Sequence, residues 1–362
     1  MTKVAIVANI PAPYREKVYE GVENYEDLDL RVFYCRRLES NRKWKFNLGR
    51  YPKKFLDATT LSLGDKYYHF SILVWVELSK FKPEVVVTTS FSFAMLLSFF
   101  WAKLNGSRHV CFTDGTVFSE SHLTWFHRIV RRFIFSKSSA FVGASNGSEA
   151  LYKSYGVSTR AIFRSCLCID NNRFSSNLGF DDDRRYDLLF SGRFTETKLP
   201  FFFAEVAKEV SSRVENLKVL VIGSGHLEGE FVAKLERYDV DYQFRGFVQQ
   251  NDLPQVYRDS RFLLFPTKND TWGVVANEAC ASGCVVVTNA AAGVSGDLII
   301  DGETGLVLPL DVSLWADRIC ELYGDSRGYN SIKEKALKHV QEYNHDKAAN
   351  GIYRAVKFAL QN

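Results

Sequence analysis

The sequence has little of what marks a membrane-spanning or secreted protein. Its longest apolar run, FSFAMLLSFFWAKL over 91–104, is shorter than the ~20 residues that a transmembrane helix needs. The first residues, MTKVAIVANIPAPYR, contain too short an apolar stretch for a signal peptide. We therefore expect a cytoplasmic protein, either free or peripheral on the inner face of the membrane.

Strong charge and metal-binding cysteine patterns are also absent. The formal net charge of +4 does not by itself indicate a nucleic-acid partner. Cys166 and Cys168 form C-x-C and Cys280 and Cys284 are four apart, but no C-x-x-C occurs and no histidine lies at zinc spacing. Several of the seven cysteines lie in apolar runs, which is typical of reduced, buried thiols in a reducing cytosol. We expect no metal site and no nucleic acid.

Two series of short apolar runs alternate with helical patterns along the chain. Runs that are apolar on both faces suit parallel strands covered by helices. The sequence thus predicts an α/β protein with two Rossmann-like domains. The expected strands are 4–9, 30–34, 84–89, 108–113 and 139–144 in the first series, and 186–192, 217–223, 242–246, 261–266 and 284–289 in the second.

The length of 362 residues also favours two domains, because one hydrophobic core rarely serves so long a chain. The stretch 171–185 is polar and rich in Asn and Asp, which indicates a linker. We expect an N-terminal domain over 1–170 and a C-terminal domain over 186–344. The end of the chain resembles two helices that break near Asn344, and the last, at about 345–362, is expected to pack on the N-terminal domain.

The segment DTWGVVANEACASG, residues 270–283, follows one expected strand and precedes another. It places Asp270 in a loop and Glu278 in a helix. In such folds ligands bind outside the carboxyl ends of the strands. Backbone N–H groups at the start of this helix would hold phosphate oxygens. They are those of Trp272, Gly273 and Val274. Carboxylates suit sugar hydroxyls because their oxygens accept O–H hydrogen bonds. The alternative is an exposed loop aspartate and a surface glutamate.

Two further turns follow expected strands. In SGRFTETKLP, Arg193 and Lys198 lie five apart, and two fixed cations suit a diphosphate. The alternative is a solvated basic loop. In VIGSGHLEGEF, Gly223 and Gly225 allow close approach of a ligand or are simply structural. A dinucleotide fingerprint would need glycine where Glu228 stands, which disfavours a nicotinamide cofactor.

Together, in this order, the three segments resemble the C-terminal domain of the family-four retaining glycosyltransferases. That family has the GT-B fold, two Rossmann-like domains facing a central cleft. Its Glu-x7-Glu signature reads Asp270-x7-Glu278 here, so the first carboxylate is one methylene shorter. GVSGDLIIDGETGLVL, over 293–308, resembles the segment that follows the signature. The resemblance implies that Glu278 binds the ribose and Asp270 the transferred sugar, while Arg193 and Lys198 stabilise the leaving diphosphate.

Other matches to the family are shorter. FRGFV, over 244–248, resembles the strand and turn beside the nucleobase, which implicates Phe247 and Val248. NIPAPYR resembles a first loop near donor phosphate and acceptor in one subgroup, which implicates Arg15. The acceptor-side position where many members carry histidine falls near FTDGT, which implicates Asp114.

The resemblance implies a retaining glycosyltransferase that moves a sugar from a nucleotide-diphosphate sugar to a glycan or lipid-linked acceptor. The expected setting is surface polysaccharide or lipopolysaccharide assembly. No cofactor and no metal are expected, because cations and a helix N-terminus can stabilise the leaving phosphate. The alternatives are a sugar-nucleotide epimerase of the same fold, a nicotinamide-dependent oxidoreductase, and a non-catalytic sugar-nucleotide-binding partner protein. Three Asp-rich triplets, at 27–29, 181–183 and 239–241, do not follow strands as a metal motif should.

One helical segment, 122–138, mixes aromatic and basic side chains. It predicts an amphipathic helix on an anionic membrane surface. The alternative is a Rossmann helix with a buried apolar side and a solvated basic side. The side chains concerned are Trp125, Phe126, Phe133 and Phe135, and Arg128, Arg131, Arg132 and Lys137.

Overall fold

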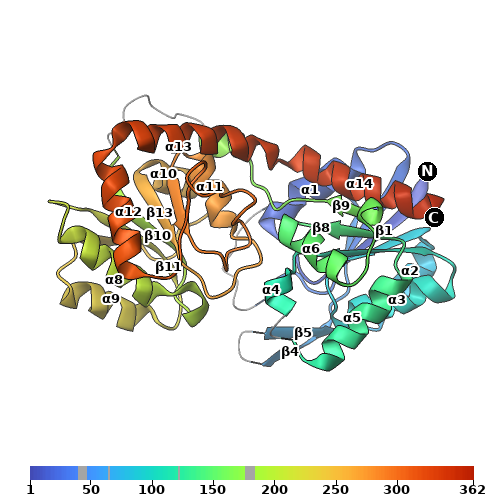
Figure 1. The fold of residues 1–362 in the computed structure, drawn as a ribbon. Coiled ribbons are helices and arrows are strands. Elements are labelled where there is room, and N and C mark those ends of the chain that lie inside the picture. The colour runs from blue at the N-terminus through green and yellow to red at the C-terminus, as the bar shows by residue number, and fades with distance from the viewer. Residues whose placement is uncertain (40–46, 64–65, 121–122, 176–183) are drawn as a thin grey trace. The chain divides into compact units, whose positions relative to one another are not determined.

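Residues 1–39, 47–63, 66–120, 123–175 and 184–362 are described by a computed structural model. The chain forms two compact units, drawn in Figure 1. Unit 1 joins the first part of the chain to its last helix, Met1–Leu167 with His345–Asn362, and unit 2 is Cys168–Asn344.

Unit 1 is built on a seven-stranded sheet in the order β3-β2-β1-β6-β7-β8-β9, in which every pair of neighbours is parallel. A hairpin of two antiparallel strands, β4 and β5, lies outside this sheet. The elements are β1 Thr2–Ala8, α1 Pro13–Glu23, β2 Leu28–Tyr34, β3 Lys53–Phe55, β4 Thr59–Leu63, β5 Lys66–Phe70, α2 Leu73–Phe81, β6 Val85–Thr88, α3 Phe93–Leu104, β7 Arg108–Thr113, α4 Val117–Glu120, α5 Trp125–Lys137, β8 Ala140–Gly143, α6 Asn146–Ser154, η1 Thr159–Ala161, β9 Ile162–Arg164 and α14 His345–Gln361.

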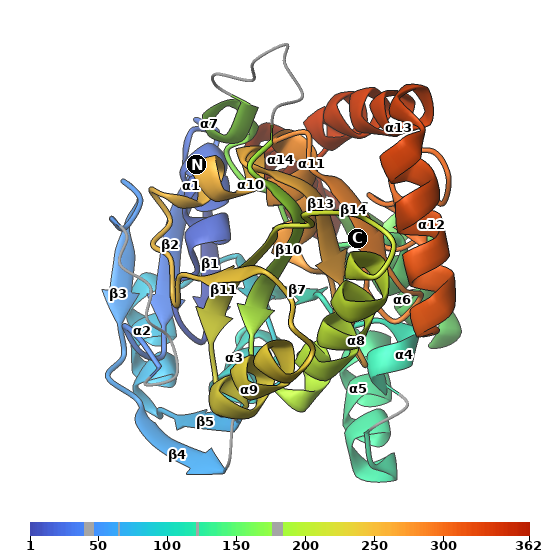
Figure 2. The ribbon, with the colours of Figure 1, turned by 90° about the vertical axis from the view of Figure 1, so that its left-hand side faces the viewer.

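Unit 2 is built on a six-stranded parallel sheet in the order β12-β11-β10-β13-β14-β15. Figure 2 shows β11, β10, β13 and β14 side by side. The elements are α7 Asn171–Ser175, β10 Tyr186–Arg193, η2 Glu196–Lys198, α8 Pro200–Ser211, β11 Val219–Ser224, α9 Glu228–Arg237, β12 Tyr242–Phe244, α10 Leu253–Arg258, β13 Ser260–Phe265, α11 Val274–Ala281, β14 Val285–Thr288, β15 Leu306–Val307, α12 Val312–Gly324, α13 Ser326–His339 and η3 Val340–Glu342.

The strand order of unit 2 is that of a doubly wound sheet, and the main sheet of unit 1 follows the same pattern. The prediction of an α/β fold with two Rossmann-like units is therefore confirmed. In each sheet the order reverses at one point, between β10 and β13 in unit 2 and between β1 and β6 in unit 1. Ligands in such sheets bind at that switch point, beyond the carboxyl ends of the strands.

The boundaries of the units differ slightly from those expected. Residues Asn171–Ser175, at the start of the predicted linker, form α7, which packs on α10 and α11 of unit 2. The rest of that stretch, 176–183, lies outside the described residues.

The last helix, α14, packs on α1 and on β7, β8 and β9 of unit 1, as Figure 1 shows. Its buried side chains recur every three or four residues, as a helix with one apolar face requires. At Gly351 the helix lies directly against the backbone at the end of β9. A Cβ added there would lie 1.7 Å from the backbone oxygen of Arg164.

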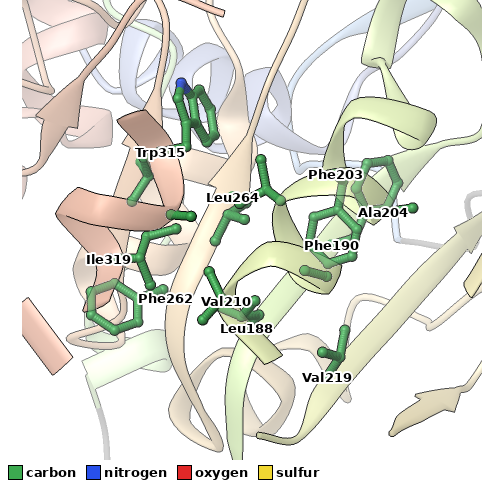
Figure 3. Packing of buried hydrophobic residues seen from close by; sticks show 14 of the residues in the cluster. Leu188, Phe190, Phe203, Ala204, Val210, Val219, Phe262, Leu264, Trp315 and Ile319 are labelled. Carbon is green, nitrogen blue, oxygen red and sulfur yellow. The ribbon is translucent and has the colours of Figure 1, made fainter. Parts of the chain in front are cut away.

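The core of unit 2 lies between the sheet and the helices α8, α9, α12 and α13. Figure 3 shows Leu188 and Phe190 of β10 with Phe203 of α8 and Trp315 of α12 in this cluster. The indole of Trp315 is fully buried, and its Nε1–H donates to the carbonyl of Pro309 at 2.8 Å. Burying one such large apolar side chain contributes about 1.5–3 kcal/mol, so this cluster is a main source of the stability of unit 2.

Among the described residues, none of the helices combines the length and the apolar character that crossing a bilayer requires.

Candidate functional site

The switch point of unit 2 is held by hydrogen bonds among three loops. The loop after β10 offers the carbonyl oxygen of Thr197, which accepts from the Lys268 N–H and from the Thr267 hydroxyl, both at 2.9 Å. Asn289, after β14, accepts from the Thr267 N–H at 2.9 Å and donates to its carbonyl at 3.0 Å. These bonds fix the loops after β10, β13 and β14 against one another at one edge of the sheet.

This arrangement brings together two residues that the sequence singled out separately. The ammonium of Lys198 forms an ion pair with Oδ2 of Asp270. Both side chains are about one fifth exposed, and Oδ1 of Asp270 also accepts from the Trp272 N–H at 3.1 Å. The cation predicted for the diphosphate is therefore paired with the carboxylate predicted for the sugar. Arg193, the last residue of β10, is exposed and forms no ion pair within the described part of the chain.

Glu278 is buried in α11, so the alternative of a surface glutamate is wrong. Only 5% of the residue is exposed, and the Tyr257 hydroxyl donates to its Oε2 at 2.7 Å. That hydroxyl also lies 2.8 Å from the hydroxyl of Ser191, on β10. Burial raises the pKa of Glu278 to about 7, opposed by the bond from Tyr257 and the charge of Arg173. The carboxyl thus changes charge near neutral pH.

The start of α11 is formed by a glycine whose backbone conformation and surroundings disfavour any side chain. Gly273 has φ +102°, and an added Cβ would lie 2.3 Å from the Phe265 ring. The neighbouring indole of Trp272 is 1% exposed and donates to Oδ1 of Asn277 at 2.7 Å. The Trp272 side chain therefore belongs to the core, and the phosphate role expected of the backbone N–H groups from Trp272 to Val274 stays a prediction.

Gly223 and Gly225 have a structural reason of their own. An added Cβ at Gly223, where φ is +134°, would lie 1.8 Å from the carbonyl oxygen of Gly192. At Gly225 it would lie 2.4 Å from the carbonyl oxygen of Phe194. The two glycines let the loop after β11 pack on the loop after β10. This packing explains them without a ligand, so their contact with a ligand stays a prediction.

The turn after β12 lies beside these loops. The carbonyl oxygen of Gly246 accepts from the Gly223 N–H at 2.8 Å, which places the turn next to the end of β11. Phe247 is 37% exposed and Val248 is half-buried, so both can meet a flat ligand from the surface. Their predicted contact with the nucleobase stays a prediction.

Unit 1 contains a pocket of about 240 Å³ at its own switch point. Arg15 and Asp114, both singled out by the sequence, meet there in an ion pair of 2.9 Å. The buried Arg15 guanidinium also donates to the Ser165 hydroxyl at 3.3 Å and lies 4.5 Å from the centre of the Phe112 ring. The pocket is lined by Ala8, Asn9, Ile10, Ala12, Tyr14, Arg15, Tyr19, Glu39, Thr89, Phe112 and Asp114.

Of the Asp-rich triplets, the one at 27–29 is engaged with the last helix of unit 1. Asp27 accepts from Lys357 at 3.0 Å in unit 1, and 181–183 lie outside the described residues. Within the described ranges, no three His, Cys, Asp or Glu side chains gather as a metal site. Metal independence stays a prediction.

Sequence reasoning missed the residues that support the predicted ones. Tyr257, Ser191, Thr267 and Asn289 carry no motif spacing, and each is identified only by its hydrogen bond. The signal that was available is a polar residue inside or directly after an apolar run, as at Ser191 and Asn289. The pocket residues Asn9 and Thr89, which directly follow β1 and β6, gave the same signal.

Comparison with known proteins adds to this geometry. Residues 185–325, which contain the switch point of unit 2, match the sequence model of the family described as Glycosyl transferases group 1. This segment of unit 2 is similar to the group 1 glycosyltransferases. It contains Arg193, Lys198, Asp270 and Glu278, so the proposed donor residues all lie inside the matched segment.

Curated relatives of this domain are distant. An uncharacterized glycosyltransferase of Methanocaldococcus jannaschii is 27% identical over 195 residues, 52% of this chain and 48% of the relative. A D-inositol 3-phosphate glycosyltransferase of Paenarthrobacter aurescens is 26% identical over 174 residues, 45% of this chain and 42% of the relative. The chain thus matches less than half the length of each of these relatives.

Solved structures resemble the whole chain. Anabaena HepE in complex with UDP superposes with a TM-score of 0.77 at 14% identity, covering 98% of this chain and 100% of that one. A glycosyltransferase from Rickettsia africae gives 0.74 at 13% identity, covering 100% and 99%. At these identities the likeness concerns the fold, which is GT-B.

Proposed function

We propose that this protein is a retaining glycosyltransferase that moves a sugar from a nucleotide-diphosphate sugar to a glycan or lipid-linked acceptor. The observations that carry the proposal are the ion pair of Lys198 with Asp270 at the switch point of unit 2 and the buried Glu278, which Tyr257 links to Ser191 near the end of β10. A sheet of this order binds ligands at that point. The proposed role in surface polysaccharide or lipopolysaccharide assembly rests on the sequence resemblance alone.

In this proposal the donor replaces the ion pair between Lys198 and Asp270 with contacts of its own. Its diphosphate takes the ammonium of Lys198 away from Asp270, and the freed carboxylate accepts hydrogen bonds from the sugar hydroxyls. Arg193, exposed at the end of β10, adds a second charge. The ribose hydroxyls donate to Glu278, whose position Tyr257 fixes.

The chemical step breaks the bond between the sugar and the diphosphate, so negative charge grows on the leaving phosphate. Lys198, Arg193 and the start of α11 stabilise that charge, and no divalent ion is needed in this scheme. Retention follows if the acceptor hydroxyl attacks from the face that the diphosphate leaves. A phosphate oxygen then accepts the acceptor proton, and no protein base is required.

The acceptor is proposed to bind in the pocket of unit 1. Its lining offers donors and acceptors suited to sugar hydroxyls, with Asn9, Thr89 and the ion pair of Arg15 and Asp114 at the switch point. A cytoplasmic location is proposed because the seven cysteines are free thiols, six of them buried.

The first test is release of nucleoside diphosphate from a panel of nucleotide sugars, beginning with UDP-glucose because HepE has been solved with it. We expect turnover to persist in excess chelator. Lys198→Ala should lower kcat on the order of 10²-fold, by analogy with losing one donor from an oxyanion site. Lys335→Ala, at an exposed position on α13, is the matched control and should leave kcat unchanged.

Each part of the proposal can fail separately. Loss of all activity in chelator, restored by magnesium or manganese, would contradict the metal-free scheme. A product whose anomeric configuration, measured by NMR, is inverted would contradict retention. Nucleotide binding without turnover of any donor would favour a non-catalytic binding protein, and interconversion of free nucleotide sugars would favour an epimerase.

A further inference from the structure

Unit 1 exposes large apolar side chains on two neighbouring helices, α3 and α5. Trp125 is 73% exposed and Leu104 is 75% exposed. The helices are in contact through aromatic rings, since the centroids of Phe100 and Phe133 lie 6.3 Å apart, and Figure 1 shows α3 and α5 next to each other. We call the exposed set the apolar face; it consists of Phe100, Leu104, Trp125, Phe126, Ile129 and Phe133.

The positions on α5 show how this face is built. At 3.6 residues per turn, Trp125, Phe126, Ile129 and Phe133 fall within roughly 100° of the helix circumference. The side that packs inward is formed by Ile134 and Phe135, both buried. Phe135, one of the aromatic residues expected on the membrane side, is therefore a core residue.

Cations border the apolar face on both sides. By the same helical spacing, Arg128 and Arg132 lie along one edge of the stripe on α5, and Lys137 lies along the other. All three are exposed. Arg131, which the sequence predicted on the membrane side, instead turns inward. It forms an ion pair with Glu120 and lies 4.4 Å from the centre of the Phe91 ring.

A further group of cations gathers where α3 and α5 end. The pKa of Lys103 is lowered, first by burial and then by the positive charges of Arg108 and Lys137. The Lys103 ammonium lies 5.9 Å from the centre of the Phe99 ring on the same helix, next in sequence to the exposed Leu104. Neither α3 nor α5 contains an acidic residue, so nothing on these two helices neutralises the cations.

We propose that the apolar face of α3 and α5 docks on an anionic lipid bilayer, with the aromatic side chains in the interface and the cations on the lipid headgroups. Apolar patches of this kind rarely remain uncovered on soluble proteins. Trp and Phe on one side of a helix and Lys and Arg beside them are what interfacial helices carry. Anionic headgroups attract each basic residue near the surface.

A second copy of the chain fits the face less well. In a two-fold symmetric contact the same surface meets itself. Arg128, Arg132 and Lys137 would then face the cations of the other copy, with no carboxylate on α3 or α5 to pair with them. A bilayer with anionic headgroups supplies the missing negative charge.

The test is co-sedimentation of the full chain with vesicles of phosphatidylcholine mixed with phosphatidylglycerol, and with phosphatidylcholine alone. We expect partition into the anionic vesicles that weakens as salt is raised. Arg128→Gln/Arg132→Gln/Lys137→Gln should reduce it by roughly 100-fold, at about fivefold for each basic residue. Arg327→Gln/Lys335→Gln/Lys338→Gln removes the same charge from exposed positions on α13 and should have no effect.

A second variant separates insertion from charge attraction. Trp125→Ser/Phe126→Ser/Ile129→Ser keeps the cations and removes most of the apolar stripe on α5, so it should lose partition at low and high salt alike. Because these side chains are exposed, its melting temperature should equal that of the wild type. The proposal would be overturned if the wild-type protein did not co-sediment with anionic vesicles. It would also be overturned if either variant partitioned like the wild type. Self-association that the apolar variant abolishes, without vesicle binding, would assign the face to a second copy.

Discussion

Among single residues, Glu278 has the most unusual environment in the site. It is a carboxyl group inside unit 2, with one hydroxyl donor at 2.7 Å and a pKa raised to about 7. The bond from Tyr257 and the charge of Arg173 only partly offset the cost of burying the carboxylate, so the folded protein keeps the proton at a pH where the unfolded chain has lost it. The same feature that would make Glu278 a ribose acceptor therefore costs stability.

This gives a pH dependence that can be measured. Because the folded-state pKa is above the unfolded value of 4.5, the unfolding free energy should fall as pH rises from about 4.5 to about 7, by on the order of 3 kcal/mol from this group. Glu278→Gln stays neutral and should lack this fall, so it should be more stable than the wild type at about pH 8 and not at about pH 4. Urea denaturation at several pH values checks it.

The control for this experiment is Glu334→Gln, an exposed glutamate on α13. Its unfolding free energy should follow the wild-type curve. A Glu278→Gln curve that runs parallel to the wild type across the same range would show that the carboxyl titrates normally. Nucleoside diphosphate binding, followed by calorimetry, should be weakened in Glu278→Gln because its amide replaces an acceptor oxygen with a donor.

Among the elements, helix α14 depends most on one small residue. Glycine inside a helix usually costs about 1 kcal/mol relative to alanine. Gly351 nevertheless lies mid-helix, because the backbone at Arg164 and Ser165 leaves no room for a Cβ. Two contacts of α14 add to this packing, the stacked rings of Tyr25 and Tyr353 at 3.9 Å and the bond from Lys357 to Asp27.

Gly351→Ala should therefore destabilise unit 1, although it raises helix propensity. An overpacked site typically costs about 1–3 kcal/mol. The matched control is Gly229→Ala, also in a helix, where an added Cβ meets nothing within 4 Å. We expect the control to be neutral or slightly stabilising in thermal unfolding. Equal melting temperatures for both variants would mean that α14 is free to shift away from Arg164.

Some secondary-structure elements were predictable from the sequence and others were not. Strands such as VVVT in β6 and in β14 were predictable because a run apolar on both faces fits the centre of a parallel sheet. The short edge strands β3 and β15 and the hairpin of β4 and β5 lack such a run. In the site, Lys198 and Asp270 were predictable singly from their turns. Their pairing, and the support of Glu278 by Tyr257, depend on contacts between segments far apart in the chain.

For the molecule as a whole, the order in which the chain passes through the two units determines which parts can fold independently. Unit 2 is a continuous segment, whereas unit 1 consists of Met1–Leu167 and the returning helix α14. All the predicted donor contacts except Arg15 lie in unit 2, which has a hydrophobic cluster of its own. Folding and nucleotide binding should therefore be separable from unit 1.

A fragment of residues 168–344 should fold alone and bind nucleoside diphosphate within roughly tenfold of the full chain, a difference of ~1.4 kcal/mol. A fragment of 1–167 should aggregate, because it exposes the surface that α14 buries with Ala348, Ile352 and Val356. Joining 345–362 to 1–167 through a flexible linker should restore a cooperative transition. A stably folded 1–167 fragment without α14 would contradict this view.

The return of α14 also sets the order in which the protein can form during synthesis. The helix is translated only after the whole of unit 2, so unit 1, although it begins first, is completed last. At ~5–20 residues per second, the ribosome needs roughly 10–35 s to pass through residues 168–344. Throughout that time β8 and β9 lack the packing of α14 against them. The nascent chain should then be at its most dependent on chaperones while its second half is already folding.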